Sequence, residues 1–80
     1  MPADKLRSRY VGILLDRVAE TRYPSAPMLD RVEAAIVDAE EAEEYVDRLL
    51  DTIEQDSYPS PQMLERVNRL ISVLEAAGAG

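Results

Sequence analysis

The sequence predicts an all-α protein in which one helical hairpin occurs twice in tandem and folds as a four-helix bundle. Apolar residues recur at helical spacing, a Tyr-Pro-Ser segment interrupts each half of the chain, and the two halves resemble each other. At an offset of 35 residues, positions 10–36 match positions 45–71 with 13 identities in 27 pairs. We interpret this match as a duplication, with repeats at about residues 5–39 and 40–77 of a single domain spanning residues 1–80.

The first helix of each repeat is indicated by apolar side chains on one helical face. The two tyrosines of these faces, Tyr10 and Tyr45, are expected to pack in the core with their hydroxyl groups at its rim. The residue before a proline avoids the α conformation, so we expect these helices to end at Tyr23 and Tyr58. The spaced positions are Tyr10, Leu14 and Val18 in the first repeat and Tyr45, Leu49 and Ile53 in the second.

The sequence also predicts where the second helix of each repeat begins. Ser25 and Ser60 follow the Tyr-Pro pairs and are suited to accept a hydrogen bond from a free backbone N–H, and Pro61 suits the first helical position. The apolar spacing then continues through Leu29, Val32 and Ile36, and through Leu64, Val67 and Ile71.

The joint between the repeats allows two architectures. No Gly, Pro, Ser or Asn occurs between Met28 and Thr52, so one long central helix with a hairpin arm at each end, dimerised, is one alternative. The other has a break near Asp38, where Asp38 and Glu41 resemble a capping box. We favour the break, because an elongated chain of this size would leave much of its core in water.

Composition restricts the chemistry that the chain can perform. The 80 residues include no Cys and no His, and the net charge is −7. The most common nucleophiles, bases and zinc ligands are therefore absent, and a negative chain repels phosphate backbones and anionic membranes. We predict no catalytic residues, no metal site, no cofactor, no nucleic-acid partner and no membrane partner, and we expect a cytoplasmic location.

The acidic segment at residues 38–44 contains carboxylates of the kind that bind cations, but it lacks the spacing that such a site needs. Helical spacing distributes its carboxylates around the axis and does not converge them on one ion, so a solvated face is expected. The segment contains Asp38, Glu40, Glu41, Glu43 and Glu44.

The candidate binding surface is the end of the bundle at which both Tyr-Pro-Ser turns emerge. Tyrosine, methionine and arginine are enriched at protein interfaces. The alternative is a structural role, in which each Tyr folds over the start of its own helix. Arg31 and Arg66 could also form ion pairs with Asp16 and Asp51 across their hairpins. The predicted surface comprises Tyr23, Tyr58, Met28, Met63, Arg31 and Arg66.

A helical hairpin of 35 residues is similar in length to tetratricopeptide-like repeats. The ordered Trp, Leu-Gly, Ala and Phe positions of that family do not occur here, so the similarity implies no function.

Two functions fit these observations. The first is a non-enzymatic protein-interaction or assembly module that binds a protein partner. The second is an acidic regulator or inhibitor that mimics nucleic acid and binds a basic protein. We also expect a homodimer, because a small core with few aromatic residues leaves apolar side chains such as Val37 and Val73 at the surface.

Overall fold

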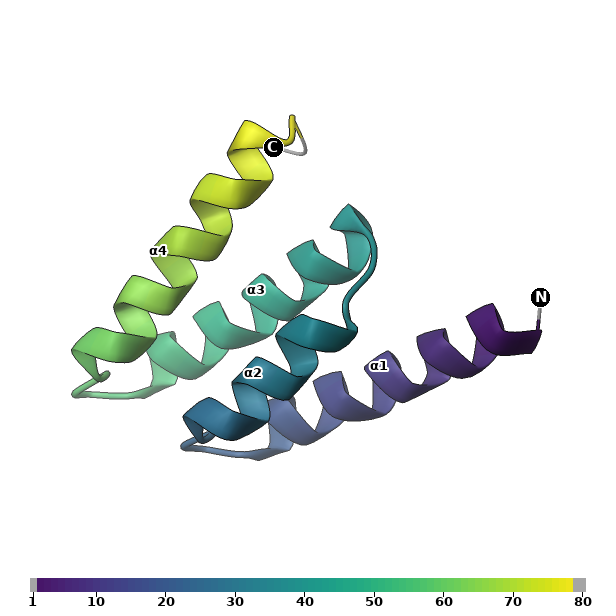
Figure 1. The fold of residues 1–80 in the computed structure, drawn as a ribbon. Helices are drawn as coiled ribbons and strands as arrows, with labels where there is room; N and C mark the ends of the chain where they lie inside the picture. Colours follow the sequence, from purple (N-terminus) through teal and green to yellow (C-terminus); the bar gives the residue numbers. More distant parts are fainter. Residues whose placement is uncertain (1, 79–80) are drawn as a thin grey trace.

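The computed structural model describes residues 2–78, which form four helices and no strand (Figure 1). The predicted all-α four-helix bundle is confirmed. The helices are α1 (Pro2–Glu20), α2 (Ala26–Ala35), α3 (Ala39–Gln55) and α4 (Pro61–Ala76).

The helices form two hairpins, α1–α2 and α3–α4, that lie side by side (Figure 1). Helix α1 packs against α2 within its hairpin and against α3 of the other hairpin, and α3 also packs against α4. The two loops inside the hairpins lie at one end of the molecule, and the α2–α3 turn lies at the other end. The molecule measures 43 × 28 × 18 Å.

The core lies between the hairpins and contains no buried polar side chain that lacks a hydrogen bond, among the residues described. Tyr45 is its largest member and is 1% exposed, whereas its counterpart Tyr10 is 43% exposed. The expectation that both tyrosines belong to the core is wrong for Tyr10, because α2 of the other hairpin covers Tyr45, whereas Tyr10 lines an open surface groove. The buried residues are Val11, Leu15, Val18, Leu29, Val32, Ala35, Tyr45, Val46, Leu49 and Val67.

The chain breaks between α2 and α3 at Asp38, as the favoured alternative predicted. The Asp38 carboxylate accepts a hydrogen bond from the Glu41 N–H (2.8 Å), and the Glu41 carboxylate accepts one from the Val37 N–H (3.3 Å). These two bonds satisfy amides at the start of α3, where the acidic side chains also oppose the positive end of the helix dipole. The long central helix is therefore excluded.

Both predicted serine caps are confirmed. Ser25 Oγ accepts a hydrogen bond from the Met28 N–H (3.3 Å), and Ser60 Oγ accepts one from the Met63 N–H (3.1 Å). Pro61 begins α4, where its missing N–H leaves no intrahelical bond unmade.

The first helix of each hairpin ends earlier than predicted, at Glu20 and Gln55 instead of at the tyrosines. Thr21 Oγ1 donates a hydrogen bond to the Arg17 carbonyl (2.6 Å) and closes the last turn of α1. The Asp56 carboxylate accepts a hydrogen bond from the Tyr58 N–H (3.0 Å) and holds the chain in a turn after α3. The Asp56 bond competes with continuation of α3, so this helix ends before Pro59 becomes the limit. The Thr21 bond does not by itself end α1, because Thr52 makes the same bond inside α3.

No helix within the described part of the chain has the length and apolar character that crossing a bilayer requires.

Candidate functional site

The two Tyr-Pro-Ser loops lie at the same end of the molecule (Figure 1). They border a small groove, here named the loop groove. Tyr23 and Tyr58 stand exposed on its two sides, and Ile53 and Met63 supply apolar surface to it. Its volume is about 240 Å³. The loop groove is lined by Arg22, Tyr23, Pro24, Thr52, Ile53, Asp56, Tyr58, Pro59, Ser60 and Met63.

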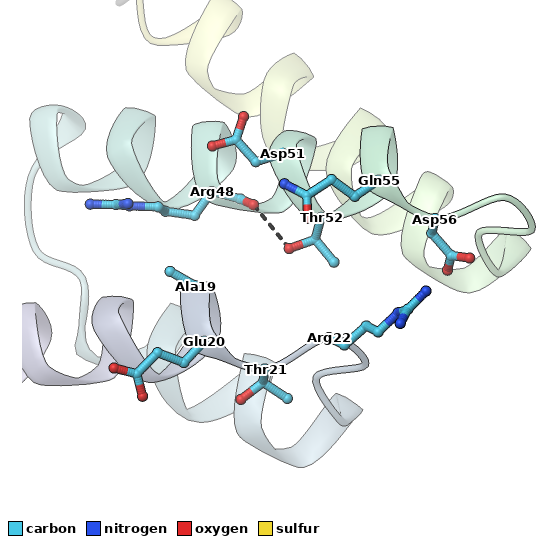
Figure 2. A pocket seen from close by; sticks show the side chains of 9 residues that line it. All are labelled: Ala19, Glu20, Thr21, Arg22, Arg48, Asp51, Thr52, Gln55 and Asp56. Carbon is cyan, nitrogen blue, oxygen red and sulfur yellow. Dashed lines mark hydrogen bonds between the residues drawn. The ribbon is translucent and has the colours of Figure 1, made fainter.

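A second and more polar groove runs between α1 and α3, here named the helix groove (Figure 2). Figure 2 shows side chains from the end of α1 and its following turn facing those from the second half of α3. Its volume is about 550 Å³. The helix groove is lined by Ala19, Glu20, Thr21, Arg22, Arg48, Asp51, Thr52, Gln55 and Asp56.

The two grooves adjoin, because Arg22, Thr52 and Asp56 line both of them. A segment of a bound molecule can therefore contact the apolar loop groove and the polar helix groove at the same time. Arg22 and Asp56 reach both grooves because they lie in the turns directly after α1 and α3.

The charges in the helix groove are mixed. Arg22 lies over the Tyr23 ring, with its guanidinium carbon 5.6 Å from the ring centroid, and Arg48 forms a salt bridge with Glu44 (3.8 Å). Thr52 Oγ1 donates to the Arg48 carbonyl (3.1 Å), as the dashed line in Figure 2 marks. Amide, hydroxyl, carboxylate and guanidinium groups of this kind suit the backbone and charged side chains of a peptide.

The predicted surface residues do not all lie together. Tyr23, Tyr58 and Met63 line the loop groove and Met28 does not, although both methionines pack against the hydrophobic core. Arg31 lies in a separate groove between α1 and α2, beside Arg7 and Tyr10.

Arg66 faces the interior and does not border the loops. It donates hydrogen bonds to Asp30 (3.0 Å) and Glu33 (2.5 Å) of α2, and its side chain is 17% exposed. The predicted pairing of Arg66 with Asp51 is wrong, because α4 presents this side chain to α2 instead of α3. Within the described residues Arg31 and Asp16 form no salt bridge with each other either.

Glu33 joins Arg66 to the buried Tyr45. The Tyr45 hydroxyl donates to Glu33 Oε2 (2.6 Å) and lies 3.4 Å from the Leu29 carbonyl oxygen. Burial, followed by the adjacent Glu33 carboxylate, raises the pKa of the Tyr45 hydroxyl above its usual range. Burial acts to lower the pKa of Arg66, but its hydrogen bonds to Glu33 and Asp30 raise it. This cluster fixes the contact between the hairpins and faces neither groove.

Sequence reasoning missed Arg22, Thr52 and Asp56, the residues shared by the two grooves. Arg22 precedes Tyr23 directly and Asp56 precedes Tyr58 by two positions, so their placement beside the tyrosines was a signal present in the sequence.

No protein-family model matches this chain, and neither a curated protein nor a solved structure shows significant similarity to it.

Proposed function

We propose that the protein is a non-enzymatic interaction module that binds an extended segment of a partner protein along the joined loop and helix grooves. The observation that carries this proposal is the continuity of an aromatic, proline-rich groove with a polar one through Arg22, Thr52 and Asp56. The partner segment places one apolar side chain in the loop groove and a polar, mixed-charge stretch in the helix groove.

The size of the loop groove supports a side chain as its occupant. Its volume of about 240 Å³ is below the roughly 300–1,000 Å³ of small-molecule and cofactor sites. Tyr23 and Tyr58 are large, exposed and supported by rigid proline turns, and such tyrosines give contact area at a low cost in conformational entropy.

Peptide selection tests this proposal. We expect peptides selected from a random library to bind with an apolar anchor, and to shift the backbone NMR signals of Thr52, Asp56 and Tyr58. Tyr58→Ala should weaken binding by about tenfold or more. Tyr10→Ala, a change of the same kind outside both grooves, should leave the affinity unchanged. Selected peptides whose shifts map to other surfaces would contradict the proposal.

The acidic regulator remains a second candidate because α3 concentrates negative charge. Among its 17 residues, seven are acidic and one is basic. A nucleic-acid mimic of this kind would bind a basic cleft with an affinity that falls steeply as salt concentration rises. Peptide binding in the two grooves at high salt would favour the interaction module instead.

Three further parts of the proposal come from the sequence. They are a cytoplasmic location, self-association, and the exclusion of nucleic acid and membranes as partners. The last part rests on the net charge of −7, which opposes binding to phosphate groups.

A further inference from the structure

The two hairpins bury opposite faces of equivalent helices. In the first helix of each hairpin, Tyr45 is 1% exposed and its counterpart Tyr10 is 43% exposed. The next pair shows the reverse, since Leu15 is 3% exposed and its counterpart Leu50 is 42% exposed. The residues in each pair share a type and a repeat position, so their surroundings alone cause the difference.

The second helix of each hairpin shows the same exchange. Leu29 is 2% exposed and its counterpart Leu64 is 46% exposed. Arg66 is largely covered and bonded to α2, whereas its counterpart Arg31 is exposed.

Each hairpin therefore has two faces, here named front and back. The contact inside the molecule joins the front face of one hairpin to the back face of the other. The front face contains Tyr10 and Arg31 in the first hairpin and Tyr45 and Arg66 in the second. The back face of the first hairpin contains Leu15, Leu29 and Glu33, with Asp30 at its edge, because Asp30 also lines the groove beside Tyr10. The equivalent residues of the second hairpin are Leu50, Leu64, Asn68 and Glu65. The front of the second hairpin packs on the back of the first, through the Tyr45 and Arg66 contacts with Leu29, Asp30 and Glu33.

We propose that a second copy of this chain continues the stack, with the front of its first hairpin packed on the back of the second hairpin of its neighbour. This contact repeats the one inside the molecule. It pairs Arg31 with Glu65 in the place of Arg66 with Asp30, and Tyr10 with Asn68 in the place of Tyr45 with Glu33.

The free front face has the form that this contact needs. A shallow, open groove lies between α1 and α2 and is lined in part by Tyr10, Asp30, Arg31 and Ala34. Leu6 and Ile13 extend the apolar surface of α1 along the same side as Tyr10, because they lie four residues before and three residues after it, and both are exposed.

Charge favours the same orientation. Helix α1 carries four basic and three acidic residues, whereas α3 carries seven acidic and one basic. Stacking front on back brings α1 of one copy beside α3 of the next, and so places unlike charges together. Two backs would instead bring two acidic α3 helices together.

The contact is heterologous, since the two surfaces that meet are different. Repeated copies of such a contact form an open chain or a closed ring, so this inference replaces the two-fold homodimer that the sequence alone led us to expect. Asn68 replaces the charged Glu33, so the contact between copies is weaker than the one inside the molecule and depends on concentration.

Sedimentation of the full chain with blocked faces tests this inference. Tyr10→Asp blocks the front face, and Leu64→Asp blocks the back face. The wild type should form species larger than two copies as its concentration rises, and each variant should associate about tenfold or more weakly than wild type. A mixture of the two variants should form a pair and nothing larger, because each supplies the one face that the other lacks.

The matched control is Tyr58→Asp, which places the same charge on an exposed tyrosine of the loop groove. It should associate as wild type does while losing the peptide binding proposed above, so the two proposals fail independently. Circular dichroism checks that each variant keeps its helices, and Glu65→Arg replaces Leu64→Asp if that variant unfolds.

Several results would overturn the inference: a wild type that stays monomeric up to about 1 mM, one that stops at two copies, or a variant mixture that forms no pair.

Discussion

At the scale of single residues, the duplicated positions act as an internal comparison in which residue type is constant and surroundings differ. Tyr10 and Tyr45 occupy the same repeat position, yet only Tyr45 is covered by the neighbouring hairpin. Its hydroxyl donates to Glu33, which also accepts from Arg66, so three side chains from three helices meet at one carboxylate. Removing one member leaves the others partly unpaired in a half-buried site.

Tyr45→Phe should lower the free energy of unfolding by about 1–2 kcal/mol, because it removes a hydrogen bond to a charged group without creating a cavity. Urea denaturation measures the change. Tyr10→Phe, the same substitution at the exposed counterpart, should change the free energy by less than about 0.5 kcal/mol. Equal effects at the two positions would show that the Glu33 contact does not stabilise the fold.

The same tyrosine should make stability depend on alkaline pH. The folded state raises the pKa of Tyr45 above its unfolded value of about 10, so above that pH the unfolded chain binds fewer protons than the folded one. This contribution to stability is complete below about pH 10 and is lost as pH rises further. Tyr45→Phe should lose less stability than wild type between about pH 9 and pH 11, as measured by urea denaturation. Parallel curves for the two proteins would contradict this prediction.

At the scale of helices, local signals in the sequence predicted how helices start better than how they end. Ser25, Ser60 and Asp38 cap their helices as predicted, since a cap depends on residues within four positions of one another. The end of α3 at Gln55 involves the Asp56 carboxylate, which accepts from the Tyr58 N–H, whereas no side-chain bond distinguishes the end of α1 at Glu20.

The binding site was less predictable than the helices because grooves depend on how hairpins pack. The repeat placed Tyr23 and Tyr58 at one end, as the structure shows, but the directions of Arg31 and Arg66 depend on which face each hairpin turns to its neighbour. Two residues of identical type and repeat position cannot be distinguished by a pattern that is the same for both.

Each serine cap should contribute about 1 kcal/mol, so Ser25→Ala and Ser60→Ala should each lower the free energy of unfolding by about that amount. Thermal melts and urea denaturation measure the loss. Ser57→Ala is the matched control, since Ser57 lies in the α3–α4 loop and makes no side-chain hydrogen bond within the described residues. An unchanged melting temperature for both cap variants would show that the Oγ contacts add no stability.

At the scale of the whole molecule, the two hairpins behave as units of a stack. Each hairpin buries a face only where a neighbouring hairpin covers it. The free energy of unfolding of such a protein is approximately the sum of the intrinsic stabilities of its hairpins and the energies of the contacts between neighbours. The molecule has one such contact and two uncovered faces, whose side chains have the types that the internal contact uses.

A chain with a third hairpin should therefore be more stable than the natural one. Residues 3–37 form one 35-residue unit, and a second copy of them inserted after Val37 gives three hairpins in a row. In the inserted copy Ala3→Asp supplies the helix cap that Asp38 supplies in the natural chain, because the two positions are equivalent. Its Tyr10 and Arg31 would then face Leu29, Asp30 and Glu33 of the first hairpin, which includes both carboxylates that Arg66 contacts in the natural molecule.

The additional contact buries one more tyrosine and the apolar groups around it, so the free energy of unfolding should rise by about 2 kcal/mol or more, with a higher urea midpoint and a single transition. The control carries Tyr10→Asp in the inserted copy alone, which leaves composition and length almost unchanged while it disrupts the new contact, and it should lose the gain. A three-hairpin chain that unfolds in two separate steps, or at the midpoint of the natural chain, would show that the two faces do not recognise each other outside their natural pairing.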